Sequence, residues 1–509
     1  MAGSLERLKE RTTLIWNLRG CGSLLGWDQL VKMPPGGAEA RAGQKAALSR
    51  VAHEALISPD FLRDLEAAEQ EVAELPADSD DACLVRASRR AYDRSARVPG
   101  RLVAELASTT ARAYEAWVEA RHRSDFPFFL PHFKKVLALS REVVEHRGYP
   151  EHPYDAFLDD YEPGIRASQV RTLFGGLKPG LVELARKVRE SGPELSHNPL
   201  DQSFPVDLQR QFAARLARSV GYDFTRGRMD VSEHPFCSAS SSRDVRITTR
   251  YSEDNMVSAL FGAIHESGHA VYEQGSPSGF DGTPLKGGCS LGFHESQSRL
   301  WENYVGRSRA YWKFHYPALV ALFPIQLQGY SLDDFYRAIN QVRPTLIRVE
   351  ADEVTYSLHV MLRFEIEYHM VDGTLAPEDV PHEWNQRMEE YLGVRPPDDA
   401  QGCLQDVHWS EALIGYFPTY CLGTMLAAQI WETVREGIPG VDEQLSRGDT
   451  SVLLGWLQDR IYRHASKFLP DELVERCTGK PLHYRAFLTY LEDKYGDLYG
   501  LGRQRVAHV

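Results

Sequence analysis

One stretch constrains the fold of this chain more than any other: residues 252–275, with the sequence SEDNMVSALFGAIHESGHAVYEQG. Its apolar residues recur at the spacing of one helix face, Ser252 is a suitable N-cap, and Gly275 is a suitable C-cap. The pattern therefore predicts a single helix over the whole stretch. The sequence HESGH at 265–269 lies inside this helix and matches the pattern H-E-x-x-H.

The two histidines of this pattern, His265 and His269, are one helical turn apart. Four helical residues give about 400° of rotation and about 6 Å of rise, so both imidazoles point the same way. This geometry predicts that they bind one zinc ion, and it places Glu266 where it can act as a base toward water. Such a site needs a third ligand, which the rest of the chain must supply.

Glu295 is the predicted third ligand. It lies 26 residues after His269, which leaves room for the first helix to end, a loop to turn back and a second helix to run alongside. His294 is the neighbouring alternative, but consecutive helical residues point about 100° apart, so we do not expect both to bind one ion. We therefore predict the ligand set His265, His269 and Glu295, with an open position for water.

Composition argues against several classes of function. The formal net charge of −13 provides no basic surplus for binding nucleic acid, and no apolar run approaches the roughly 20 residues of a membrane-spanning helix. The N-terminal residues mix charges throughout, without the apolar core of a signal peptide. Seven scattered cysteines form no C-x-x-C pair and indicate reduced thiols. We therefore expect a cytoplasmic protein that binds neither nucleic acid nor membrane.

Helical patterns cover most of the chain, and no linker marks a domain boundary, so we expect one domain over residues 1–509. Residues 244–251 alternate with β-branched side chains and predict a half-exposed strand, whose free edge could pair with an extended peptide. A long helix is predicted over 344–371. Residues about one turn apart on one face of this helix are Arg348, Asp352, Tyr356 and His359.

The assembled pattern resembles the carboxypeptidase Taq family of zinc metallocarboxypeptidases. The matching motifs are LGWDQ (25–29), MPPGG (33–37), HPF (234–236), DVRIT (244–248), HESGH (265–269), HESQSR (294–299), IRVEAD (347–352) and GCLQDVHW (402–409). The resemblance implies a mostly α-helical gluzincin fold, similar to neurolysin and angiotensin-converting enzyme, with a small three-stranded β-sheet beside a deep active-site groove. That groove would divide the single domain into two helical subdomains. The resemblance also implies a cytoplasmic homodimer that releases single residues from peptide C-termini with broad specificity.

An exopeptidase must also bind a free carboxylate, and the planar fork of an arginine suits its two oxygens. Arg348 is our prediction for this role, through its match to the IRxxAD motif of the family, whereas the sequence alone does not separate it from Arg343 or Arg246. The other predicted substrate-binding residues are Tyr420 and His234, as alternative oxyanion donors, and Gln405 and His408, in a segment that resembles the motif closing one end of the groove.

Two other functions compete with a carboxypeptidase. An oligopeptidase would cut internal bonds and would not need a free C-terminal carboxylate. A non-enzymatic helical scaffold, with a structural metal or none, would have no use for Glu266 between the histidines or for an open coordination position, so the presence of Glu266 disfavours that interpretation. A site of two histidines and one glutamate also accepts cobalt in place of zinc. Asp352 either orients other groups or forms an ordinary salt bridge.

Overall fold

Helices dominate the computed structural model of the chain, which describes residues 3–192 and 197–501. Contacts divide the chain into two compact units. Unit 1 comprises residues 1–96, 197–339 and 430–481, and unit 2 comprises residues 97–196, 340–429 and 482–509. The predicted mostly α-helical fold with a small sheet is confirmed. The predicted groove within a single domain stays a prediction.

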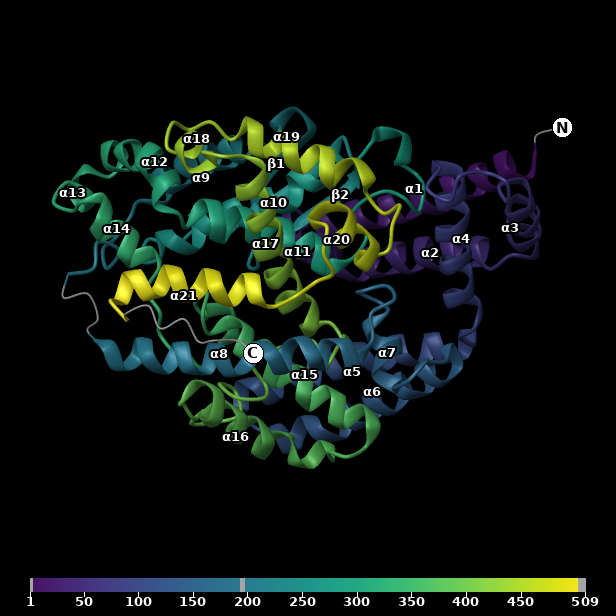
Figure 1. Cartoon of the computed structure of the whole chain (residues 1–509). Helices are drawn as coiled ribbons and strands as arrows, with labels where there is room; N and C mark the ends of the chain where they lie inside the picture. The colour runs from purple at the N-terminus through teal and green to yellow at the C-terminus, as the bar shows by residue number, and fades with distance from the viewer. Residues whose placement is uncertain (1–2, 193–196, 502–509) are drawn as a thin grey trace. The chain divides into compact units, whose positions relative to one another are not determined.

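Unit 1 contains the first four helices, the sheet and the predicted metal-binding helix. Its helices are α1 (Ser4–Val31), α2 (Ala38–Leu56), α3 (Pro59–Glu71), α4 (Asp80–Ala96), α9 (Val206–Val220), α10 (Met256–Gly275), α11 (Leu291–Arg299), α12 (Arg309–Leu322), α13 (Pro324–Leu327), α14 (Leu332–Ile339), α18 (Val441–Leu445), α19 (Ser451–Arg460) and α20 (Pro470–Thr478). A π-helical segment, η4 (Leu300–Gly306), continues α11 directly. In Figure 1, α1 to α4 lie together at the purple end of the chain.

Unit 2 is built from helices of 6 to 25 residues. They are α5 (Gly100–Arg123), α6 (Phe126–Arg147), α7 (Pro153–Leu158), α8 (Ala167–Ser191), α15 (Tyr356–Asp372), α16 (Val380–Leu392) and α21 (Arg485–Tyr499). The boundary between the units falls inside α17 (Phe417–Gly437). Within the described ranges, no helix combines the length and the apolar character that crossing a membrane requires.

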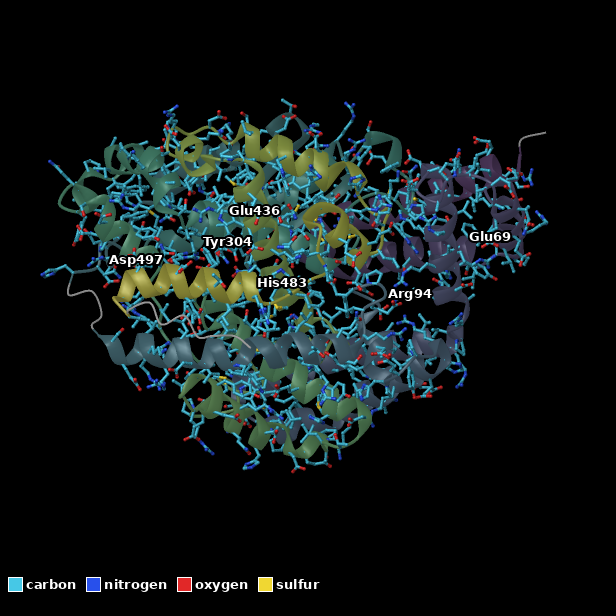
Figure 2. All side chains as sticks on the ribbon, viewed as in Figure 1. Glu69, Arg94, Tyr304, Glu436, His483 and Asp497 are labelled. Carbon is cyan, nitrogen blue, oxygen red and sulfur yellow. The ribbon has the colours of Figure 1, made fainter. Side chains whose placement is uncertain are left out.

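Packing inside each unit follows the amphipathic faces of the helices. In unit 1, one buried cluster joins α1 to α4 through side chains such as Leu8, Leu56 and Phe61, each of which is removed from solvent at a gain of about 1.5–3 kcal/mol. Charged residues lie at the margins of this cluster. Glu69 of α3, labelled in Figure 2, accepts hydrogen bonds from Arg89 of α4 at 2.7 and 2.8 Å and so ties the two helices together.

The sheet of unit 1 has three strands, β1 (Gly227–Val231), β2 (Cys237–Ser241) and β3 (Asp244–Thr249). Their order is β1-β3-β2, with β1 parallel and β2 antiparallel to β3. Strand β3 matches the predicted strand, but it is the central one, so the edge that could pair with a peptide belongs to a neighbour. Helix α10 packs against both β2 and β3.

Two predicted helix boundaries are wrong. Helix α10 begins at Met256 instead of residue 252, because the side chain of Asn255 caps it by accepting the amide of Ser258 at 3.0 Å. The helix predicted over 344–371 begins only at Tyr356, and Arg348 lies before it in a short 3₁₀ turn. The four residues predicted on one helix face therefore do not share a helix.

Asp352 explains where that second helix starts. Its carboxylate accepts the backbone amides of Val354 and Thr355 at 2.9 and 3.0 Å, and also the amide of Arg343 at 3.0 Å. It satisfies amide groups that have no partner at the start of a helix. Asp352 therefore anchors the backbone before α15, a role that differs from both alternatives considered from the sequence.

Candidate metal centre

Helices α10 and α11 meet at Gly268, the fourth residue of the HESGH pattern. A Cβ atom at this position would lie 2.7 Å from Cα of Ser298 and 2.8 Å from the carbonyl oxygen of Gln297. Both contacts are with backbone, which cannot swing aside as a side chain can. Glycine is therefore required here for the two helices to approach closely enough to share one group of ligands.

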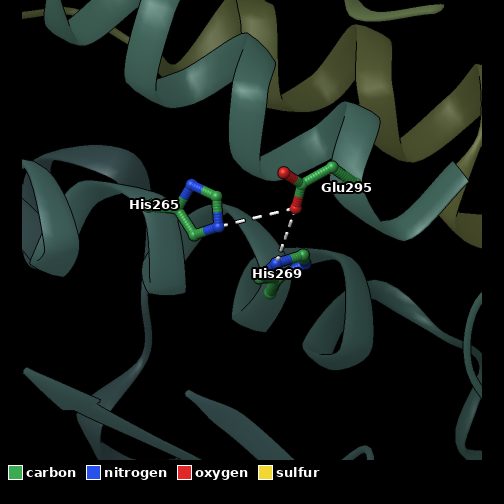
Figure 3. A group of neighbouring side chains, drawn as sticks. All are labelled: His265, His269 and Glu295. Atoms are coloured by element: carbon green, nitrogen blue, oxygen red, sulfur yellow. Dashed lines mark ion pairs between the residues drawn. The ribbon is translucent and has the colours of Figure 1, made fainter. Parts of the chain in front are cut away.

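The three predicted ligands converge from these helices (Figure 3). Nε2 of His265 and Nε2 of His269 each lie 3.5 Å from the same oxygen, Oε2 of Glu295. The potential ligand atoms of the three side chains all lie within 4.8 Å of one another. Two imidazole nitrogens and one carboxylate oxygen form a donor set that suits a divalent metal, and zinc sites of catalytic type use three such protein ligands.

Further side chains orient His265 and Glu295. Nδ1 of His265 lies 2.9 Å from Oε2 of Glu302, which belongs to the π-helical segment η4. Arg299 donates to Oε1 of Glu295 at 2.7 Å and to Glu302 at 3.3 Å, so its guanidinium joins the two carboxylates. A second arginine, Arg307, donates to Glu302 at 3.3 Å. These contacts leave Nε2 of His265 and Oε2 of Glu295 facing each other.

Burial and neighbouring charges set the protonation of the carboxylates. Burial raises the pKa of Glu266 to about 7, and the carboxylates of Glu295 and Glu302 add to the shift. Although burial opposes it, Arg299 and the histidines hold the pKa of Glu295 well below its usual range. Glu295 is therefore ionised at neutral pH, as a metal ligand must be, while Glu266 exchanges protons near neutrality, which suits a general base.

His294, the alternative ligand, has other partners. Its Nδ1 lies 2.7 Å from Nδ1 of His269, and its Nε2 lies 3.0 Å from Oε1 of Glu273. Within the described residues it is not part of the group whose ligand atoms converge. His294 therefore contacts the predicted ligand His269 on the side of its Nδ1 atom.

The predicted arginine lies in a second buried cluster, in unit 2. Arg348 donates through Nε and Nη2 to Oδ1 of Asp406, at 3.1 and 2.7 Å, and through Nη1 to the hydroxyl of Tyr356 at 3.0 Å. Arg363 donates to the other oxygen of Asp406 at 2.7 Å. Two guanidinium groups thus share one carboxylate, and they outnumber it by one charge.

The other predicted residues of unit 2 surround this arginine. The side-chain oxygen of Gln405 accepts the backbone amide of Arg348 at 2.9 Å. The guanidinium of Arg348 lies over the ring of Tyr420, 5.0 Å from its centroid. The ring of His408 lies 6.4 Å from that of Tyr420, and burial lowers the pKa of His408 to about 4, so it is neutral at pH 7. Four of the predicted substrate-binding residues are therefore neighbours.

The fifth, His234, belongs to unit 1 and lies between β1 and β2. Its side chain is exposed, and its carbonyl oxygen accepts a hydrogen bond from Ser232 at 2.6 Å. The structure therefore places the two residues predicted as alternative oxyanion donors in different units.

Several residues of these clusters were missed in the sequence. Glu302 lies seven residues after Glu295, which is nearly two turns of a helix and so the same face. Asp406 lies between two predicted residues in QDVH. Spacing could have identified Glu302, whereas the partnership of Asp406 with Arg348 joins residues 58 positions apart and has no signal in a single sequence.

Comparison with known proteins gives one consistent result. The family model of carboxypeptidase Taq (M32) metallopeptidases matches residues 7–495. The chain is 44% identical to thermostable carboxypeptidase 1 of Thermus thermophilus, over 95% of this chain and 96% of that protein. It is 37% identical to carboxypeptidase 1 of Bacillus subtilis, over 94% and 95% of the two chains.

Solved structures agree. The crystal structure of the M32 carboxypeptidase of Deinococcus radiodurans superposes with a TM-score of 0.95 at 40% identity and covers 98% of this chain and 99% of that one. Metallocarboxypeptidase 1 of Trypanosoma cruzi gives a TM-score of 0.92 at 37% identity, with 97% and 99% covered. The similarity therefore extends over nearly the whole length of each chain.

Proposed function

The chain belongs to the carboxypeptidase Taq (M32) family of metallopeptidases and is a metallocarboxypeptidase, and from this we propose that His265, His269 and Glu295 hold its metal and that the metal is zinc. The family implies a divalent metal ion. One observation supports the ligand set above all: two imidazole nitrogens face the same carboxylate oxygen at 3.5 Å. Zinc accepts this combination of ligands, and cobalt is the proposed substitute.

Glu266 is the proposed catalytic residue. A bound divalent metal supplies Lewis acidity, which makes water more acidic and polarises the scissile carbonyl. The carboxylate of Glu266 takes the proton of the attacking water and later gives it to the leaving amine. Burial raises its pKa to about 7, so it can both accept and release a proton near neutral pH. Helix α10 holds it one residue from His265.

Arg348 is the proposed anchor for the free carboxylate of the substrate. Its donors are only partly used by Asp406 and Tyr356, because a guanidinium has five N–H groups. Asp406 balances one of the two arginines, which leaves the cluster favourable for a further anion. Tyr420 or His234 is proposed as the donor to the oxyanion, and Gln405 and His408 as part of the wall around the last residue of the peptide.

Single-residue release with broad specificity, a homodimer and a cytoplasmic location complete the proposal. They rest on the family resemblance, and the cytoplasmic location is consistent with cysteines that form no disulfide among the described residues. Light scattering coupled to size-exclusion chromatography tests the dimer, because the mass of one chain is 57.6 kDa. The competing oligopeptidase and scaffold functions are not favoured by the comparisons.

Mass spectrometry of a mixed peptide library, with and without a chelator, tests the proposed specificity. We expect products shortened by single C-terminal residues, no cleavage after chelation, and no cleavage of peptides whose C-terminus is an amide. Cleavage of amidated peptides at internal bonds would contradict the role of a free carboxylate and favour an oligopeptidase.

Glu266→Gln tests the base. The variant keeps its shape but cannot accept the proton, so we expect metal content to remain and kcat to fall by about 10²–10⁴-fold. Glu253→Gln is the matched control, because Glu253 is exposed just before the same helix and the substitution is chemically identical. Retained activity in Glu266→Gln would overturn the proposed mechanism.

A further inference from the structure

The two predicted metal-binding histidines are supported in different ways. His265 turns Nδ1 directly to the carboxylate of Glu302, at 2.9 Å. His269 turns Nδ1 to another imidazole, Nδ1 of His294 at 2.7 Å, and only beyond that ring is there a carboxylate, Glu273 at 3.0 Å from Nε2. The imidazole of His294 thus lies between the predicted ligand His269 and the carboxylate of Glu273.

The proton positions in this series of hydrogen bonds, from His269 through His294 to Glu273, follow from the ligand geometry. A neutral imidazole that binds a metal through Nε2 keeps its proton on Nδ1. His269 must therefore donate to His294, and Nδ1 of His294 must accept. The only proton of a neutral His294 is then on Nε2, where it is donated to Oε1 of Glu273. One arrangement of protons satisfies all three side chains.

Glu273, at the far end of this series of hydrogen bonds, has a defined charge and a defined partner. Burial alone would raise the pKa of Glu273, but His294 and Lys286 lower it to about 2. This carboxylate is therefore ionised at neutral pH. Nζ of Lys286 lies 3.6 Å from Oε2 of Glu273 and donates to the carbonyl oxygen of Ala239 at 2.8 Å. Ala239 belongs to β2, so the series of side-chain contacts that begins at His269 ends on the sheet.

Packing holds the ring of His294 in this position. The ring of Tyr272 lies 5.3 Å from it, between centroids. A Cβ atom at Gly288 would come within 3.0 Å of Cδ2 of His294 and 2.9 Å of the Tyr272 ring, so the backbone at Gly288 closes in on both rings. Side-chain exposure of His294 is only 19%. The imidazole therefore has little freedom to turn away from His269.

We propose that His294 is a positioning residue for the metal ligand His269. It selects the tautomer that leaves Nε2 of His269 free for the metal and, through Glu273 and Lys286, ties that ring to β2. The inference rests on the proposed ligand set His265, His269 and Glu295. Groups behind a metal-binding histidine typically change metal affinity by about 10–100-fold, and we expect His294 to act within this range.

Zinc affinity, measured by competition with a chromophoric chelator, tests the proposal. His294→Leu removes both hydrogen bonds, and we expect zinc to bind about 10–100-fold more weakly. His294→Gln offers an acceptor and a donor on one side chain, so we expect it to recover most of that loss. The absorption spectrum of cobalt-substituted protein should change in His294→Leu and return toward the wild type in His294→Gln.

A matched control and a second route keep the test decisive. His315 is a buried histidine of the same unit with no hydrogen-bond partner for either ring nitrogen among the described residues, so His315→Leu should leave zinc affinity unchanged. Glu273→Gln keeps the imidazole in place and removes only the charge behind it. We expect several-fold weaker zinc binding from it, even if His294→Leu fails to fold.

Two outcomes separate this inference from the proposed function. Wild-type zinc affinity in both His294→Leu and Glu273→Gln, together with strong loss in His269→Ala, would overturn the role of His294 and keep the ligand set. Unchanged affinity in His269→Ala would overturn the ligand set itself. An equal loss in His294→Gln and His294→Leu would show that the ring is needed only for packing, which also contradicts the proposal.

Discussion

The two buried charge clusters of this enzyme are opposite in sign. In unit 1, Arg299 and Arg307 pair with the carboxylates of Glu295 and Glu302, and the nearby Glu266 puts negative charge in excess when it is ionised. In unit 2, Arg348 and Arg363 face Asp406 alone in the shared ion pairs, so positive charge is in excess. With Glu266 ionised and His265 neutral, each cluster differs from neutrality by one charge.

This difference is consistent with the partner proposed for each cluster. Burying unbalanced charge costs several kcal/mol per ion, and the cost is recovered only when a partner of opposite sign arrives. The excess of unit 1 suits a metal cation, and the excess of unit 2 suits a substrate carboxylate. These are the two partners that the proposed function assigns to the clusters, a metal to unit 1 and a free C-terminal carboxylate to unit 2.

The largest expected effect comes from breaking the cluster of unit 2. Asp406→Asn leaves two buried guanidinium groups without their shared counter-ion, and we expect unfolding by urea to show a loss of about 3–5 kcal/mol. Asp442→Asn is the control, because its pair with Arg435 is half exposed and should contribute no more than about 1 kcal/mol. Equal losses in both variants would mean that the Asp406 cluster has no special weight.

The next effect separates binding of the carboxylate from folding. Arg348→Gln leaves Asp406 paired with Arg363, so the variant should fold. We expect kcat/KM to fall roughly 30- to 1000-fold, which corresponds to a loss of about 2–4 kcal/mol in transition-state stabilisation. Arg343→Gln and Arg246→Gln test the two arginines that the sequence alone left open, and we expect much smaller changes. A larger loss in either of them would move the anchor away from Arg348.

A smaller effect tests the approach of α10 and α11 in unit 1. Gly268→Ala puts a methyl group against the backbone of Ser298 and Gln297, and we expect a loss of about 1–3 kcal/mol in stability together with weaker metal binding. Gly455→Ala is the control, because a Cβ atom there meets nothing within 4 Å in helix α19, and it should stabilise by about 0.4–1 kcal/mol. Unchanged metal affinity in Gly268→Ala would show that the ligands do not depend on this contact.

The smallest effect distinguishes the clusters by pH. Burial alone would lower the pKa of His265, but Glu295 and Glu302 raise it above its ordinary value. A proton therefore competes with the metal for this ring already near neutral pH. Metal affinity should fall by about tenfold, or 1.4 kcal/mol, for each pH unit below that pKa. Titrating zinc affinity from pH 8 to pH 5 measures this slope, and a flat profile would contradict it.

Asp406 provides the contrast. Although burial opposes it, Arg348 and Arg363 hold its pKa far below the ordinary range. A carboxyl group with a lowered pKa contributes its full stability above the pKa of the unfolded chain, about 3.9, and loses it only as the pH falls further. The effect of Asp406→Asn on stability should therefore be equal at pH 7 and pH 5.

Helical periodicity explains which parts of the site could be predicted. His265, Glu266 and His269 are close in sequence, and the turn of one helix alone brings the histidines together. Glu295 lies on the next helix, and its distance in the chain leaves room for an antiparallel return. The start of α10 was missed because the choice between Ser252 and Asn255 as N-cap depends on which side chain reaches the free amides.

Other features depended on contacts that a single sequence does not encode. The helix predicted over 344–371 failed because Asp352 uses its carboxylate to anchor a turn before α15. Asp406 reaches Arg348 and Arg363 only after three segments of unit 2 have folded together. Such partners are set by packing in three dimensions, and sequence spacing alone gives no indication of them.

The sequence by itself determined the family of this protein and predicted its chemistry: the proposed ligand pair, the base beside it and the third ligand. Local geometry suffices for the histidine pair and the base because a helix has a fixed turn, whereas the third ligand follows from its spacing in the chain and the family from the resemblance of several motifs. Tertiary structure alone decided how each group is held: which nitrogen of each histidine is free, which acid stands behind it, and which arginines share Asp406. Those choices depend on hydrogen bonds between residues far apart in the chain, and they exist only when the chain is folded.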